Sequence, residues 1–126
     1  MDIEQRKYAR FSVQDNTFAV LRSGFEKVGK VNDISEKGFS FSYLTESIKA
    51  GSDSDFSEVD IFLSWDSFHL HKVSCKIVYD IQDSESITYG SIMKRRCGLH
   101  FGELINSQSE LFELFLNKYT TGPLSP

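Results

Sequence analysis

Apolar and polar residues alternate with a period of two through most of this chain, and this pattern constrains the fold more than any other feature. Successive side chains of a β-strand point to opposite faces of the sheet, so the alternation is typical of half-buried strands. The alternating stretches lie at residues 11–20, 39–43, 59–65, 73–81 and 97–101, and a further strand is expected around Val28 and Val31. They predict an all-β fold, a small antiparallel barrel or sandwich of about six strands joined by short turns.

The same alternation assigns side chains to faces. It places Val73, Cys75, Ile77, Tyr79 and Ile81 on one face of a single strand. In the first stretch the parity of the apolar residues changes at positions 14–16, so we expect a bulge or a break there. Two polar segments, 51–55 and 83–86, are typical of a loop and of a hairpin connection.

The stretch that departs from this period lies near the C-terminus. Ser107 and Glu110 have the spacing of a capping box, and the apolar residues after them recur at helical spacing. We therefore expect a β-barrel with a terminal α-helix, the helix covering residues 107–120. Gly122 and Pro123 stop it, and the last few residues are expected to be loose.

The length of the chain, 126 residues, fits one ordinary domain. We expect a single domain over 1–126, with a flexible lead-in at 1–10 and the barrel at 11–103. No apolar run approaches the roughly 20 residues that span a bilayer, and the N-terminus has no signal-peptide pattern, so a cytoplasmic protein without membrane insertion is expected. Cys75 and Cys97 lie in alternating apolar stretches and are expected to be buried and reduced.

The charged residues exclude several classes of function. A net charge of −4 disfavours broad binding to DNA or RNA. The basic run Lys94-Arg95-Arg96 could face an anionic partner or a ligand phosphate, but a solvated strand end is the more ordinary explanation. His69 and His71 alternate as metal ligands can, but with no Cys or carboxylate pattern nearby we expect no metal site. No Ser/His/Asp, Cys/His or paired-carboxylate arrangement stands out, so no catalytic residue, no enzyme and no cofactor are expected.

Two short motifs carry most of the functional information, Arg6-x-x-x-Arg10 and Asp33-x-Ser35-x-x-Gly38. Guanidinium groups form charge-assisted, bidentate hydrogen bonds with phosphate, and the second motif offers a carboxylate, a hydroxyl and a glycine beside them. Each motif also has an ordinary explanation, because the arginines fit a solvated segment and Asp, Ser and Gly are common turn residues. The second motif is the rarer by chance, so it is the more informative of the two.

The order and setting of these motifs resemble the PilZ domain family of bacterial cyclic di-GMP receptors. Family members begin with Arg-x-x-x-Arg just before the first strand, as at Arg6 and Arg10. They continue with Asp/Asn-x-Ser-x-x-Gly between early strands, as at 33–38, and the stretch 97–101 resembles their usual Gly-x-x-Phe strand end. The resemblance covers nearly the whole chain and implies a six-stranded antiparallel barrel followed by a C-terminal helix.

The resemblance implies that cyclic di-GMP is the ligand and that each motif residue has a role. Arg6 and Arg10 would clamp a phosphate or the O6/N7 edge of guanine, or stack on a base. Asp33 would accept from guanine N–H donors, and this would select guanine over adenine. Ser35 would hydrogen-bond near the ligand, and Gly38 would permit a close approach of the backbone.

One position departs from the commonest family pattern, because Gln5 stands where another arginine often precedes the motif. Lys7 is a further candidate contact that supplies part of that charge, and Tyr79 is the nearest match to an aromatic residue that contacts ligand in some members. The departure leaves open whether one or two stacked dinucleotides bind. A charged lead-in that orders on binding would signal to a protein partner.

Two other functions remain open at this point. A PilZ-fold adaptor would bind a protein without physiological nucleotide binding, but retention of the arginines and of the second motif disfavours it. A barrel that binds single-stranded nucleic acid through exposed Phe and Tyr is disfavoured by the net negative charge.

Overall fold

The computed structural model describes residues 9–23, 25–46, 57–64, 67–83 and 92–123. Its elements in chain order are β1 (Phe11–Val13), β2 (Thr17–Ser23), β3 (Phe25–Ile34), β4 (Gly38–Thr45), β5 (Ser57–Leu63), β6 (His69–Gln82), β7 (Met93–Phe101), α1 (Asn106–Lys118) and β8 (Thr120–Pro123). The expected break in the first stretch is confirmed, because the chain turns between β1 and β2 where Thr17 N–H donates to the Gln14 carbonyl at 3.1 Å.

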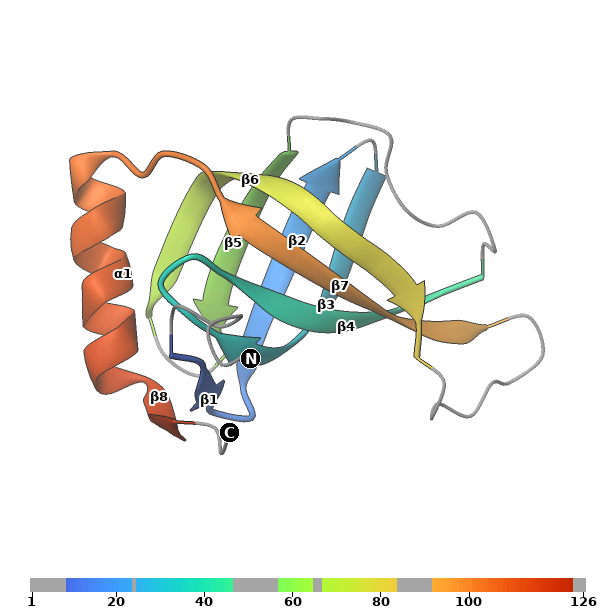
Figure 1. Cartoon of the computed structure of the whole chain (residues 1–126), viewed down its shortest axis with the longest axis horizontal. Coiled ribbons are helices and arrows are strands. Elements are labelled where there is room, and N and C mark those ends of the chain that lie inside the picture. The colour runs from blue at the N-terminus through green and yellow to red at the C-terminus, as the bar shows by residue number, and fades with distance from the viewer. Residues whose placement is uncertain (1–8, 24, 47–56, 65–66, 84–91, 124–126) are drawn as a thin grey trace, which may run out of the picture.

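Six strands close into a barrel, as Figure 1 shows. The sheet runs in the order β2-β5-β6-β7-β4-β3, and β3 pairs again with β2, so the ring has no free edge. Neighbouring strands in the ring are all antiparallel. β1 pairs with β3 outside the ring, and β8 pairs with β1. The predicted six-stranded antiparallel barrel with a C-terminal helix is therefore confirmed.

The barrel interior holds the core. Alternate residues of each strand point inward, and in β4 these are the aromatic residues Phe39, Phe41 and Tyr43, each at most 4% exposed. Cys75 and Cys97 are buried and free, as expected. Burial raises the pKa of both thiols to about 12, so neither is a reactive thiolate near neutral pH.

Helix α1 packs against the end of the barrel where β7 finishes (Figure 1). The Phe112 ring meets Phe101 edge-on at 4.9 Å between centroids, and Phe115 lies 5.3 Å from Phe68. Burying these rings supplies most of the stability of a helix this short. Within the described residues, no helix is long and apolar enough to cross a bilayer.

The ends of the helix differ from the predicted range 107–120. Ile105 is the N-cap residue, and its N–H donates to the Gln108 side-chain oxygen at 3.1 Å, so the predicted Ser107/Glu110 box is wrong. The helix ends at Lys118, because the chain extends from Thr120 to pair with β1. The predicted stop at Gly122 and Pro123 is thus wrong, because both residues belong to β8, and the last few residues, 124–126, lie outside the described residues.

A bulge in β6 changes which residues face the core. Ile77 pairs with Leu99 and Tyr79 with Gly98, so Val78 is an extra residue that reverses the alternation. The core-facing assignment is confirmed for Val73, Cys75 and Ile77. It is wrong for Tyr79, which lies over Gly98 on the outside, and for Ile81, which is 53% exposed.

Candidate functional site

A second bulge turns Asp33 to the outside of the barrel. Val31 pairs with Phe41 and Asp33 with Ser40, so Asn32 is the extra residue in β3. Without the bulge, Asp33 would share the inward face with Val31; with it, Ile34 points inward instead and is fully buried. The carboxylate therefore lies on the outer surface, where other side chains cover it to 7% exposure.

Two arginines and a serine cover that carboxylate. Arg10 donates from Nε at 3.0 Å and from Nη2 to Asp33 Oδ1. Arg96 Nη2 lies 3.5 Å from Oδ2, and the Ser40 hydroxyl donates to the same oxygen at 3.4 Å. The guanidinium groups remain partly accessible, with 28% of the Arg10 side chain and 42% of the Arg96 side chain exposed. The structure thus joins the N-terminal segment, β3 and β7 at one charged cluster.

Asp33 begins a row of residues that crosses four strands on the outer face. Asp33 in β3 pairs with Ser40 in β4, Ser40 with Gly98 in β7, and Gly98 with Tyr79 in β6. Strands are spaced about 4.8 Å apart, so the row, called here the outer row, extends over about 14 Å. Its two middle members, Ser40 and Gly98, are small residues. An arginine-lined carboxylate therefore stands at one end and an aromatic ring at the other.

Gly98 is required by the ring above it. A Cβ at this position would lie 2.2 Å from the Tyr79 ring, so only glycine lets the ring lie against the β7 backbone. The predicted candidate Tyr79 is thereby placed on the same face as Asp33, Ser40 and Arg96.

The Ser35 to Gly38 segment forms the tight connection between β3 and β4. Ser35 N–H donates to the Gly38 carbonyl at 2.8 Å, and the Ser35 hydroxyl accepts from Lys37 N–H at 3.2 Å. A Cβ on Gly38 would lie 1.9 Å from the Leu99 carbonyl oxygen of the neighbouring strand. Both motif residues thus hold the turn that follows Asp33, as their turn chemistry predicts.

The three residues of the basic run Lys94-Arg95-Arg96 lie in three different environments. Arg95 lies inside the barrel mouth, where its Nε donates to Asp80 Oδ1 at 2.8 Å. Tyr43 donates to the other oxygen of Asp80 at 2.6 Å, and burial together with this carboxylate raises the pKa of Tyr43 well above its usual range. Lys94 lies 3.8 Å from Asp83 Oδ2, and only Arg96 reaches Asp33.

Arg96 is a member of this candidate site that sequence reasoning named only as part of the basic run and not individually. One signal was available, because Arg96 lies two residues before Gly98 and so shares its face. Its Nε is buried without a hydrogen-bond partner among the described residues, which leaves one donor for a further acceptor. Arg6 and Lys7, the other predicted contacts, lie outside the described residues.

Solved structures of known proteins resemble this fold. The PilZ domain of YcgR from Escherichia coli, solved with c-di-GMP, matches with a TM-score of 0.66 and 11% identity over 90% of each chain. The MrkH–c-di-GMP complex of K. pneumonia matches with a TM-score of 0.64 and 17% identity over 91% of this chain and 51% of MrkH.

PlzA of Borreliella burgdorferi, in complex with c-di-GMP, matches with a TM-score of 0.52 and 14% identity over 82% of this chain and 46% of PlzA. This chain therefore spans about half the length of MrkH and PlzA. No protein-family model and no curated protein matches the sequence. The closed ring of six strands, the C-terminal helix and these likenesses together show that the chain has the fold of a PilZ domain.

Proposed function

We propose that this protein is a cytoplasmic receptor for cyclic di-GMP, which binds along the outer row and acts by binding, without catalysis. The observation that carries the proposal is the row itself, with two arginines on Asp33 at one end and Tyr79 at the other. The fold supports it, because the YcgR, MrkH and PlzA structures named above all contain c-di-GMP.

The chemistry of the row matches the ligand. Cyclic di-GMP carries two phosphodiester charges and two guanines. Arg10 and Arg96 offer partly exposed guanidinium groups for a phosphate or for the O6/N7 edge of guanine. Ser40 has a small side chain and Gly98 has none, so no large side chain projects from the middle of the row. The Tyr79 ring offers an apolar surface for a base.

Binding in this proposal exchanges partners at Asp33. Arg10, Arg96 and Ser40 occupy both carboxylate oxygens of Asp33. When a phosphate takes the guanidinium groups, guanine N–H donors replace them on the carboxylate, so neither the acid nor the arginines are left unpaired. Ser35 and Gly38 hold the turn that follows Asp33, and in this proposal both would lie beside the bound ligand.

Titration calorimetry with cyclic di-GMP tests the proposal. We expect the intact chain to bind, and Arg10→Ala or Arg96→Ala to weaken binding tenfold or more. Each hydrogen bond to a charged group contributes about 1.5–3 kcal/mol, and about 1.4 kcal/mol changes a dissociation constant tenfold. Lys94→Ala is the matched control, because Lys94 lies on the same strand beside Asp83 and should leave the affinity unchanged.

The outcomes separate the receptor from its alternative. An intact chain that gives no heat at tens of micromolar ligand contradicts the receptor and favours the PilZ-fold adaptor. Binding that survives both arginine substitutions keeps the receptor but rejects the outer row as its site.

The N-terminal segment is proposed to carry the signal to a protein partner. Arg10 ties this segment to Asp33, and Arg6 and Lys7 precede it, so a ligand that engages these side chains would fix the segment over the barrel. We expect hydrogen exchange of amides 2–10 to slow when cyclic di-GMP is added, measured by mass spectrometry. Exchange in α1 serves as the internal control. Equal exchange of the segment with and without saturating ligand would reject this switch.

A further inference from the structure

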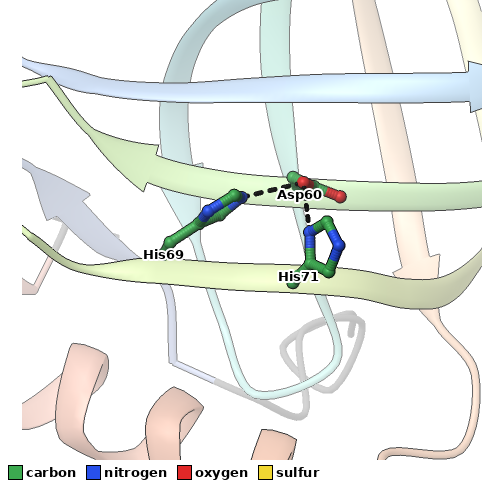
Figure 2. Close-up of side chains that lie close together, drawn as sticks. All are labelled: Asp60, His69 and His71. Carbon is green, nitrogen blue, oxygen red and sulfur yellow. Dashed lines mark hydrogen bonds and ion pairs between the residues drawn. The ribbon is translucent and has the colours of Figure 1, made fainter.

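Three side chains converge on the outer face of the β5–β6 hairpin, as Figure 2 shows. His69 Nε2 and His71 Nδ1 each lie 2.8 Å from Asp60 Oδ2. The three donor atoms lie within 4.8 Å of one another. The sequence-based expectation that no carboxylate accompanies these histidines is therefore wrong, because strand pairing brings Asp60 to them across the hairpin.

The other oxygen of Asp60 is held by the protein. Arg22 Nη1 donates to Oδ1 at 2.7 Å, and Lys72 N–H donates to the same atom at 2.9 Å. The Asp60 side chain is only 3% exposed, whereas the side chains of His69 and His71 are 50% and 55% exposed. The arrangement is a fixed carboxylate with one oxygen aimed at two adjustable imidazoles.

A strained bulge builds this arrangement. Val59 pairs with Val73 and Ile61 with Leu70, so Asp60 stands opposite two residues, His71 and Lys72. Lys72 has φ of 51°, a left-handed conformation that is unfavourable for a residue with a Cβ. Such strain persists only where the surroundings fix it, and it is common at functional sites.

The helix supports the bulge from the other side. The Gln108 side-chain nitrogen donates to the carbonyls of His71 and Lys72 at 3.0 and 3.2 Å. Its side-chain oxygen meanwhile accepts from the N-cap residue Ile105. The backbone that presents the second histidine is thus fixed by Asp60 on one side and by α1 on the other.

We propose that Asp60 Oδ2, His69 Nε2 and His71 Nδ1 bind a divalent transition metal ion of the Zn²⁺ class. Two imidazoles and one carboxylate are the donors that borderline ions prefer, and three protein ligands leave the exposed side open to water. Arg22 and the Lys72 amide orient the carboxylate as outer-shell partners orient ligands in metal sites.

The distances permit such an ion with only small movements. Metal–donor bonds of about 2.0–2.2 Å place neighbouring donors about 2.9–3.5 Å apart, depending on the geometry. The two histidine–carboxylate distances of 2.8 Å are close to this range, and the exposed rings can rotate outward. Arg22 and the Lys72 amide both donate to Asp60 Oδ1, as they would to an ionised carboxylate, and this leaves Oδ2 for the ion.

Metal binding fixes the tautomer of each ring. A ring nitrogen that donates to a carboxylate oxygen at 2.8 Å carries a proton, whereas a metal needs that nitrogen unprotonated. Zn²⁺ therefore displaces any proton from His69 Nε2 and His71 Nδ1, and each bound ring carries its proton on the other nitrogen, Nδ1 of His69 and Nε2 of His71. The change of tautomer is a signature that a purely structural cluster would not give.

Calorimetric titration of the untagged chain with ZnCl₂ tests the site. We expect one equivalent to bind, and His69→Ala or His71→Ala to weaken binding at least tenfold. Either variant removes one contact at Asp60 Oδ2 but leaves Oδ1 held by Arg22 and the Lys72 amide. His100→Ala is the matched control, because this exposed histidine lies outside the cluster. MgCl₂ should give no heat, because Mg²⁺ prefers oxygen ligands.

The tautomers supply the second readout. We expect ¹⁵N–¹H long-range correlation spectra to show both rings changing tautomer when one equivalent of Zn²⁺ is added. Absence of Zn²⁺ binding, or binding that both single variants retain, would overturn the proposal. Binding with unchanged tautomers would place the ion elsewhere and overturn it equally.

Discussion

Asp33→Ala is expected to weaken cyclic di-GMP binding about a hundredfold and to abolish the preference for guanine. Two hydrogen bonds from a base to a carboxylate contribute about 3 kcal/mol or more together, and about 1.4 kcal/mol corresponds to a factor of ten. The same change leaves Arg10 and Arg96 without their partner. Adenine has an acceptor at N1 and no amino group at C2, so cyclic di-AMP lacks the donors that Asp33 accepts.

Calorimetry with both dinucleotides measures this prediction. The intact chain should prefer cyclic di-GMP, Asp33→Asn should lie between it and Asp33→Ala, and Asp15→Ala is the control because Asp15 is exposed and pairs only weakly with Lys30, at 3.4 Å. Tighter binding by Asp33→Ala would mean that Asp33 only competes with the ligand for the arginines. The exchange of partners proposed above would then be wrong.

The alternation of apolar and polar residues was enough to predict the strands, because burial of one face of a strand makes every second residue apolar. It failed where a bulge inserts a residue. Val78 reverses the faces in β6, so Tyr79 and Ile81 lie outside the core. The sequence has no marker for such an insertion, since the pairing register of the neighbouring strand decides where the extra residue goes.

The candidate site could be predicted in part for the same reason. Asp33 lies at the end of β3 and Ser35 in the turn that follows, so local sequence was enough to place them together. Arg96 and Tyr79 join them through the pairings β4–β7 and β6–β7, which only closure of the barrel determines. The long-range part of a site built across strands cannot be derived from spacing in the chain.

The outer row also explains why small residues lie between its charged and aromatic ends. Each pairing places two Cβ atoms about 4.5–5.5 Å apart, so a large side chain at either middle position would fill the space between Asp33 and Tyr79. Ser40 covers Asp33 without filling that space, and Gly98 lets the Tyr79 ring lie against the β7 backbone. Register and side-chain size thus act together to keep this face open to a flat ligand.

Gly38→Ala is expected to destabilise the fold by about 3 kcal/mol or more and to lower the melting temperature by roughly 10 °C. The new Cβ would lie 1.9 Å from the Leu99 carbonyl oxygen and 2.9 Å from the His100 Cα, and both are backbone atoms that cannot rotate away. β4 must therefore move off β7, which breaks the pairing that carries the outer row. Thermal unfolding followed by circular dichroism measures the loss.

Gly102→Ala is the matched control for this change. Its Cβ would lie 3.2 Å from the Ser74 side chain, a contact that a small shift relieves, so the melting temperature should stay close to that of the intact chain. If both variants melt alike, the contact between β4 and β7 is looser than Gly38 implies. If Gly38→Ala alone melts early, it should also bind cyclic di-GMP more weakly, because the turn that fixes Asp33 begins to move before the rest of the barrel unfolds.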